Sequence, residues 1–288
     1  MVDADGGFAA QQQDPPGSTS AMSPRPDHGE ETYVGSGKLS GLKALVTGGD
    51  SGIGRAVAIA FAREGADVGI GHLETEQPDA DEVVAEIRAA GRTGVSLPGD
   101  LVDRSTCEQV VAEAVAQLGG LDILVNNAGY HWARGPEGVA GLEPEQVDRV
   151  IRTNLAAVIW MVRAAAPHLS PGSSIINTSS IQAYQPSPML VDYATTKAAI
   201  NTISKALAQQ LAPKGIRVNV VAPGPIWTPL QTAGGQPPEK LPEFGAETPL
   251  GRAGRPAELA PAYVFLASGE SSYVSGETLS VNGGMPTP

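Results

Sequence analysis

The stretch TGGDSGIG at residues 47–54 decides the fold of this chain. It follows the apolar run 44–46 and precedes residues 55–64, whose apolar positions recur with helical spacing. A strand, a glycine-rich loop and a helix in this order bind a dinucleotide pyrophosphate. Glycine lets the backbone lie close to the phosphates, and the helix N-terminus offers unpaired N–H groups. An ordinary turn is the alternative interpretation, and the flanking strand and helix favour the phosphate site.

Apolar runs and helical periodicity alternate from about Lys38 onward. The apolar runs predict strands at 43–47, 67–72, 93–98, 121–125, 174–178, 217–221 and 278–281. The helical pattern covers 55–64, 80–90, 105–118, 144–168, 191–211 and 256–268. Several strands are apolar at consecutive positions, as is typical of strands covered on both faces. The pattern predicts an α/β fold, a doubly wound seven-stranded parallel sheet of the Rossmann type in a single domain.

Two helix ends carry recognisable signals. Ser105 and Glu108 have the spacing of a capping box, which predicts a helix start at Ser105. Gly65 follows the first helix and predicts its end, because glycine accepts the left-handed backbone conformation found there.

Composition narrows the class of protein. The chain has 288 residues, a hydrophobic share of 41% and a net charge of −12, and no apolar run approaches the ~20 residues of a membrane span. The acidic balance argues against nucleic acid and anionic membranes as partners. We see no secretory signal, and the single cysteine, Cys107, suits a reducing cytosol. We therefore expect a cytoplasmic protein.

Two segments stand apart from the alternating pattern. Residues 1–37 are rich in polar residues and proline and carry a net charge of −5, so they predict an arm that is flexible or lies extended on the body or on a neighbouring subunit. The catalytic domain then occupies 38–288. Residues 223–255 contain seven prolines and no clear strand, which predicts a lid over the binding site.

Tyr193 and Lys197 are candidate catalytic residues. They lie four positions apart in a helical stretch, so their side chains share a face. A phenol ordinarily has a pKa near ~10, and we expect a neighbouring ammonium to lower it towards neutrality, which suits a general acid and base. Ser180 follows a strand end and offers a hydroxyl for the reacting oxygen, with Ser179 as the competing candidate. Asn154 interrupts a helical stretch and is either a packing residue or the holder of a water beside Lys197.

These motifs, together with Asn126-Asn127-Ala128-Gly129 after the fourth strand, resemble the short-chain dehydrogenase/reductases over about residues 38–284. The arm that ends in YVGSGKL at 33–39 resembles a bacterial stress-associated branch described as aldehyde reductases or glucose-dehydrogenase-like proteins. The resemblance implies an NAD(P)-dependent oxidoreductase that moves a hydride between NAD(P)(H) and an aldehyde, ketone, secondary alcohol or sugar. A non-catalytic dinucleotide-binding sensor or scaffold is the alternative, and its expected mark is the loss of one of the four residues Asn154, Ser180, Tyr193 and Lys197.

The resemblance also implies residue roles. Tyr193 is the general acid and base, Lys197 lowers its pKa and holds the nicotinamide ribose, Ser180 positions the reacting oxygen and Asn154 supports a proton relay. The predicted cofactor contacts are Gly48, Asp50, Ser51, Gly52, Ile53, Gly54, His72, Asp100, Leu101, Asn126, Ala128, Gly129, Tyr193, Lys197, Pro223, Gly224, Ile226 and Thr228. The predicted substrate contacts are Ser180, Tyr193, His131, Gln182 and Trp227.

The sequence slightly favours NAD over NADP. The position after the second strand, where a carboxylate selects NAD, is His72, and Ser51 occupies a loop position that is often basic. A partly protonated His72 tolerates either cofactor, whereas Asp50 and Glu74 disfavour a 2′-phosphate. The four histidines lack metal-ligand spacing, so we expect no metal. The family resemblance implies a homotetramer, packed in part through residues 280–284.

Overall fold

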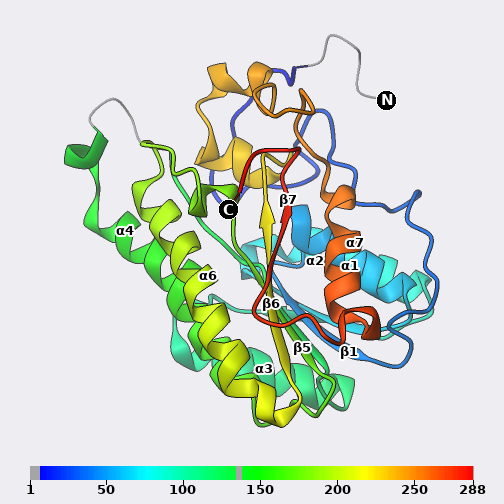
Figure 1. Ribbon diagram of the computed structural model, residues 1–288. Coiled ribbons are helices and arrows are strands. Elements are labelled where there is room, and N and C mark those ends of the chain that lie inside the picture. The colour runs from blue at the N-terminus through cyan, green and yellow to red at the C-terminus, as the bar shows by residue number, and fades with distance from the viewer. Residues whose placement is uncertain (1–6, 134–137, 288) are drawn as a thin grey trace.

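The computed structural model describes residues 7–133 and 138–287, and its strands form one seven-stranded sheet in the order β3-β2-β1-β4-β5-β6-β7 (Figure 1). The strands are β1 (Lys43–Thr47), β2 (Asp67–His72), β3 (Gly94–Pro98), β4 (Ile123–Asn126), β5 (Ser174–Thr178), β6 (Arg217–Pro223) and β7 (Thr278–Val281). Every neighbouring pair is parallel. The prediction of a doubly wound α/β sheet is therefore confirmed.

Helices cover both faces of this sheet (Figure 1). They are α1 (Gly52–Arg63), α2 (Gln77–Ala89), α3 (Arg104–Leu118), α4 (Pro144–Ile151), α5 (Ala157–Ala165), α6 (Val191–Leu211) and α7 (Ala260–Ala267). One hydrophobic cluster joins α1, α2 and α7 to the sheet, and a second joins α3, α5 and α6 to the opposite face. The two layers leave the carboxyl ends of the strands as the edge where loops gather.

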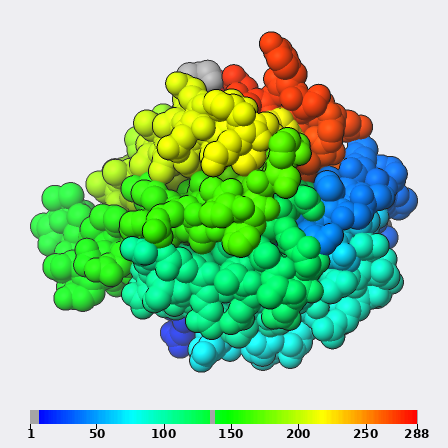
Figure 2. Space-filling model, turned by 90° about the horizontal axis from the view of Figure 1, so that it is seen from below, coloured from blue at the N-terminus to red at the C-terminus, as the bar shows by residue number. Residues whose placement is uncertain are grey.

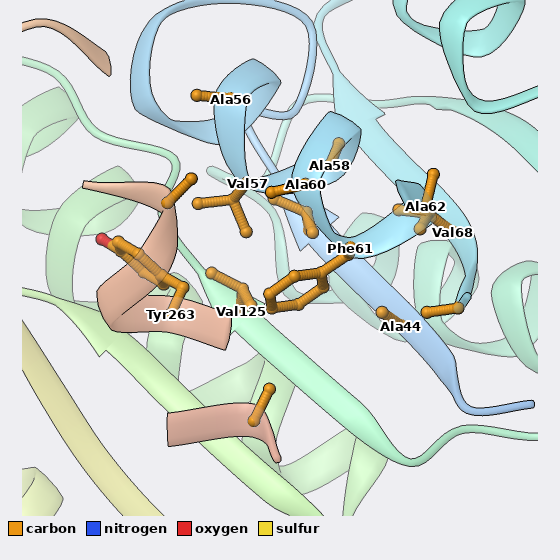
Figure 3. Packing of buried hydrophobic residues seen from close by; sticks show 14 of the residues in the cluster. Ala44, Ala56, Val57, Ala58, Ala60, Phe61, Ala62, Val68, Val125 and Tyr263 are labelled. Atoms are coloured by element: carbon orange, nitrogen blue, oxygen red, sulfur yellow. The ribbon is translucent and has the colours of Figure 1, made fainter. Parts of the chain in front are cut away.

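The packing of α1 holds the glycine loop in place. Its core residue Phe61 points toward Val125 of β4, which lies between Phe61 and Tyr263 of α7 in Figure 3. Ala56, Ala58, Ala60 and Ala62 are also buried, so this helix is enclosed on nearly every side. Small side chains let the neighbouring helix and the sheet approach closely, and burying a side chain such as Phe61 stabilises the fold by ~1.5–3 kcal/mol. The start of α1 is thereby fixed at the strand edge.

The stretch 144–168, expected as one helix, is divided. Residues Arg152–Ala156 form a π-helical turn between α4 and α5. Such turns contain one extra residue and occur often at functional sites. Asn154 lies inside this turn with its side chain completely buried. The sequence marked the position as unusual for a helix but did not predict the turn.

One helix end was predicted correctly and one was not. Gly65 has φ +97° and follows the last turn of α1, as expected. The helix α3, by contrast, begins at Arg104 after Asp103, so Ser105 does not cap it. The Glu108 carboxylate accepts hydrogen bonds from Arg104 and Arg163. The capping-box prediction was wrong because the helix starts one residue earlier, which places Ser105 inside its first turn.

Residues 7–37 lie along the body (Figure 1). The Gln13 N–H donates to the carbonyl of Thr232, and the Thr19 N–H donates to Asp79 of α2. Farther along, Tyr33 donates its hydroxyl proton to Glu64 at the end of α1. The arm thus connects segment 223–255 to the layer of α1, α2 and α7.

Figure 2 views the molecule from below, where residues from many parts of the chain pack side by side in one surface. Every helix within residues 7–133 and 138–287 is too short or too polar to cross a bilayer.

Candidate active site

A cavity of about 490 Å³ opens at the carboxyl ends of the strands. It runs from the glycine loop and the end of β2 to Tyr193 on α6 and to segment 223–255. The sheet order reverses between β1 and β4, and open α/β sheets bind ligands in the crevice at such a point. The cavity is therefore where the topology places a ligand.

The glycine loop has the geometry of a phosphate cradle. Gly48 and Gly52 have φ angles of +61° and +50°, which side-chain-bearing residues rarely adopt. A Cβ added at Gly54 would lie 1.8 Å from the carbonyl oxygen of Gly48, so only glycine fits there. Ser51 precedes α1 without a side-chain cap hydrogen bond, which leaves the N–H groups of the first turn available to an anion.

Polar side chains hold the loop against the end of β4. The Thr47 hydroxyl accepts hydrogen bonds from the N–H groups of Asn127 (3.0 Å) and Ala128 (3.1 Å). The Asn127 amide donates to the carbonyl oxygens of Thr47 and Gly48. These bonds fix the two loops that form the floor of the cavity.

At the β2 end the cavity wall is acidic. Asp50 is 1% exposed, and its Oδ2 has no hydrogen-bond partner. Burial, reinforced by the nearby Glu76 carboxylate, raises the pKa of Asp50 to about 8. His72 bonds the Leu73 carbonyl through Nδ1 and the Ser96 hydroxyl through Nε2. Burial also lowers the pKa of His72, which favours the neutral ring over the partly protonated one that the sequence suggested.

Tyr193 and Lys197 share a face of α6, as their spacing predicts. The Lys197 Nζ lies 5.4 Å from the centre of the Tyr193 ring and donates to the Thr178 carbonyl at 2.8 Å. Burial lowers the pKa of Lys197 to about 8 and raises the pKa of Tyr193 to about 12, while a hydrogen bond with Ser180 opposes the latter shift. The predicted lowering of the Tyr193 pKa by the ammonium is thus wrong, because desolvation raises this pKa and only Ser180 opposes the rise.

Both serines line the cavity, and they differ in what their hydroxyls bond. The Ser180 hydroxyl accepts from the Gln182 N–H at 3.1 Å and acts on Tyr193 in the direction that lowers its pKa. The Ser179 hydroxyl donates to the backbone carbonyl of Lys197 at 2.9 Å and is buried. The geometry therefore favours Ser180 over Ser179 for contact with a reacting oxygen.

Asn154 braces the loop beside Lys197. Its Oδ1 accepts from the Tyr130 N–H at 2.7 Å, and its Nδ2 donates to the Tyr130 carbonyl and to Thr196. A Cβ added at Gly129 would lie 3.6 Å from the Lys197 Nζ and 3.7 Å from the Asn154 Oδ1. Gly129 thus lies between the two side chains.

The predicted substrate residues do not all face the cavity. His131 lines it and packs against the Tyr193 ring at 4.8 Å, and burial lowers the pKa of His131 to about 4. Gln182 also lines it. Trp227 does not: it stacks on Phe8 of the arm at 3.7 Å and donates to the Pro24 carbonyl. The prediction of a substrate contact at Trp227 fails because the arm covers that side chain.

The cavity gathers most of the predicted residues. Lining positions are Gly48, Asp50, Ser51, Gly52, Ile53, His72, Asp100, Leu101, Ala128, Gly129, His131, Ser180, Gln182, Tyr193, Lys197, Pro223, Gly224, Ile226 and Thr228. Gly54, Asn126 and Asn154 lie behind this lining, where Asn126 donates to the Asn177 amide oxygen. They support the wall and do not form its surface.

Several lining residues escaped the sequence analysis. Pro15 and Pro16 come from the arm, Glu76 from the turn after β2, and Tyr130 and Arg149 from the region after β4. Arg149 pairs with Asp100 and lies over the Tyr130 ring at 5.2 Å. Tyr130 follows the Asn-Asn-Ala-Gly motif directly and was identifiable by that position. The others carried no local signal.

The comparisons with known proteins agree with this geometry. A family model described as enoyl-(acyl carrier protein) reductase matches residues 48–286. General stress protein 39 of Bacillus subtilis is 47% identical, with 96% of this chain and 95% of that protein covered. The chloroplastic NADPH-dependent aldehyde reductase 1 of Arabidopsis thaliana is 44% identical, with 93% and 94% covered.

A solved structure extends the likeness to three dimensions. The short-chain dehydrogenase from Burkholderia cenocepacia, in complex with NADP, superposes with a TM-score of 0.79 at 34% identity and covers 86% of this chain and 98% of its own. The fold and the site thus define an oxidoreductase of the dinucleotide-binding type. The chain belongs to the short-chain dehydrogenase/reductase family.

Proposed function

We propose that this protein is an NAD(P)(H)-dependent oxidoreductase that interconverts a carbonyl and an alcohol, acting on an aldehyde, a ketone or a secondary alcohol such as a sugar. The observation that carries the proposal is that Tyr193, Lys197 and Ser180 meet in the same cavity as the glycine loop. The NADP complex of a structural neighbour and the NADPH-dependent aldehyde reductase among the relatives support it.

The cavity residues fit a dinucleotide. The cradle at Gly48, Gly52 and Gly54 and the open start of α1 suit a pyrophosphate, and Lys197 and Gly129 lie at the end where the nicotinamide ribose belongs. When bound, the cofactor supplies the hydride donor or acceptor, and its oxidised ring adds a positive charge.

Tyr193 and Ser180 handle the reacting oxygen. In the reductive direction both hydroxyls hydrogen-bond to the substrate carbonyl, and Tyr193 then gives its proton to the oxygen as the carbon is reduced. Burial keeps Tyr193 protonated, with a pKa raised to about 12, so the phenol is the proton donor in its resting form. Lys197, held by the Thr178 carbonyl, supplies the charge that stabilises the phenolate afterwards.

Asn154 acts as a positioning residue in this scheme. Its hydrogen bonds to Tyr130 fix the loop that carries Gly129, against which Lys197 packs. The proton relay through a water at Asn154 stays a prediction. So do the homotetramer, which light scattering measures, and the cytoplasmic location.

The decisive experiment compares Tyr193→Phe with the control Tyr184→Phe, which removes a phenol hydroxyl outside the cavity lining. A panel of aldehydes, ketones, sugars and secondary alcohols is assayed with each nicotinamide cofactor by absorbance. We expect Tyr193→Phe to lower kcat by about 10²–10⁴ while it still binds cofactor, because only the proton transfer is lost. If this variant keeps most of its turnover, the mechanism is wrong.

A further inference from the structure

Three carboxylates surround the point where the glycine loop meets the end of β2. Asp50 comes from the loop, Glu76 from the turn after β2 and Asp79 from α2, and the charges of Glu76 and Asp79 both act on Asp50. Glu76 accepts from the Leu73 N–H, and Asp79 accepts from the Thr19 N–H, each at 2.8 Å. The Oδ2 of Asp50 alone among their groups is buried without a partner.

The two cations nearby, Arg55 and Arg149, pair with other carboxylates, although the Nη1 of Arg55 has no partner. The Arg55 guanidinium on α1 donates to Glu30 at 3.1 Å and to Glu82 at 3.0 Å, and Arg55 is absent from the cavity lining. Arg149 on α4 pairs with Asp100, and its charge acts on Glu76. Both ring nitrogens of His72 form hydrogen bonds with protein groups.

This corner is where the fold places the adenosine ribose of a dinucleotide. Gly71, His72 and Leu73 line the cavity beside Asp50 and Glu76. In doubly wound folds, the end of the second strand contacts the ribose hydroxyls, and its residue separates NAD from NADP. Here that residue is His72, whose two ring nitrogens already bond to protein groups. The carboxyl groups of Asp50 and Glu76 are therefore the groups left to distinguish NAD from NADP.

We propose that Asp50 and Glu76 together recognise the group at the 2′ position of the adenosine ribose. They favour a free 2′-hydroxyl when Asp50 is ionised and accept a 2′-phosphate when Asp50 is protonated. The inference rests on the proposed dinucleotide function. A 2′-hydroxyl donates to a carboxylate, whereas a phosphate carries about −1.5 to −2 charges and is repelled by one. A protonated carboxyl can instead donate to the phosphate.

The proposal makes cofactor preference depend on pH. With the pKa of Asp50 raised to about 8, the carboxyl is mostly protonated at pH 7 and mostly ionised at pH 9. A phosphate with a second pKa of ~6 is already doubly charged across this range, so it contributes little titration of its own. Between pH 7 and pH 9 the NADPH dissociation constant should therefore rise and the NADH dissociation constant fall, each by up to about tenfold, so their ratio rises by up to about a hundredfold.

Binding of each reduced cofactor to the full-length protein, followed by fluorescence at pH 7, 8 and 9, tests this without turnover. Calorimetry at pH 8 in two buffers of different ionisation enthalpy adds a second measure. We expect NADH binding to release protons and NADPH binding to take them up, because the two ligands favour opposite states of Asp50. A ratio that stays constant with pH while both cofactors bind overturns the proposal.

Variants assign the effect to residues. Asp50→Asn should flatten the pH dependence of the ratio and shift it towards NADPH, and Glu76→Gln should shift it less. Glu74, which the sequence suggested would disfavour a 2′-phosphate, is exposed and outside the cavity lining, so the control Glu74→Gln should behave like the wild type. The proposal fails if Asp50→Asn keeps the wild-type pH dependence. It also fails if NADPH binds more tightly at every pH and Arg149→Ala abolishes that preference. If neither cofactor binds, the proposed function fails first.

Discussion

At the scale of single residues, burial sets the charge states in the cavity. The pKa values of Tyr193, Lys197 and Asp50 are all shifted in the direction that favours the neutral side chain. Desolvation is the largest cause in each case. The spacing of Tyr193 and Lys197 predicted that they share a helix face. It could not predict the direction of the Tyr193 shift, because desolvation depends on how completely the surrounding elements close over the ring.

Asp50 should make the stability of the unliganded protein depend on pH. Its folded-state pKa of about 8 lies above the ordinary carboxyl value, so the folded state holds its proton longer than the unfolded state. Stability contributed by this group is therefore lost as pH rises from ~4 through 8. Asp50→Asn should match the wild-type Tm near pH 4 and exceed it by several degrees at pH 8.5, as measured by calorimetry. A Tm difference that does not vary with pH would contradict this assignment.

At the scale of elements, the π-helical turn at Arg152–Ala156 places Asn154. The sequence predicted one long helix over 144–168, because the apolar periodicity continues on both sides of the turn. An extra residue within a helix leaves that periodicity nearly unchanged, so the pattern does not reveal it. The packed neighbours Tyr130 and Thr196 supply the hydrogen bonds that hold the turn.

Asn154→Ala should weaken both the fold and the catalyst. It leaves the N–H and carbonyl groups of Tyr130 without their amide partner, which costs about 1–3 kcal/mol of unfolding free energy. We expect kcat to fall more than KM rises, since Gly129 and Lys197 lose their support. Urea unfolding and steady-state kinetics measure the two effects. Asn201→Ala is the control, because the Oδ1 of Asn201 already lacks a partner; equal losses in both variants would exclude the bracing role.

Thr47→Val should loosen the junction of β1 and β4. The substitution keeps the shape of the side chain but removes the oxygen that accepts from the N–H groups of Asn127 and Ala128. Two part-buried donors then lack partners, at a cost of about 1–3 kcal/mol each. Thermal unfolding should show a lower Tm, and cofactor titration a weaker affinity. An unchanged affinity would show that the glycine loop keeps its geometry without this link.

At the scale of the whole molecule, the arm joins the segment 223–255 to the layer of α1 and α2. Phe8 stacks on Trp227, Met22 and Leu241 complete a small apolar cluster, and Arg25 pairs with Glu82. Pro15 and Pro16 contribute directly to the cavity wall. The site therefore depends on a segment that its composition predicted to be flexible or to lie extended on the body or on a neighbouring subunit, without placing it at the cavity.

Deletion of residues 1–26 should lower the Tm and speed cofactor release, because it exposes Trp227 and removes part of the cavity wall. Phe8→Ala is a milder form, expected to cost about 1–3 kcal/mol of burial. Val34→Ala, at a side chain 86% exposed, is the matched control. Stopped-flow displacement of the reduced cofactor measures release. A truncated protein with wild-type release rates would show that the arm only stabilises the fold.

The sequence by itself determined the strand and helix pattern, the glycine loop and the shared face of Tyr193 and Lys197. These features depend on local backbone preference and on the periodicity of neighbouring residues along the chain. Only the tertiary structure decided which serine hydroxyl is bonded to the backbone, that Trp227 belongs to the arm contact, and that Glu76, Arg149 and two arm prolines reach the site. Those outcomes depend on packing between segments far apart in sequence, where burial and competing partners fix each side chain's orientation and charge.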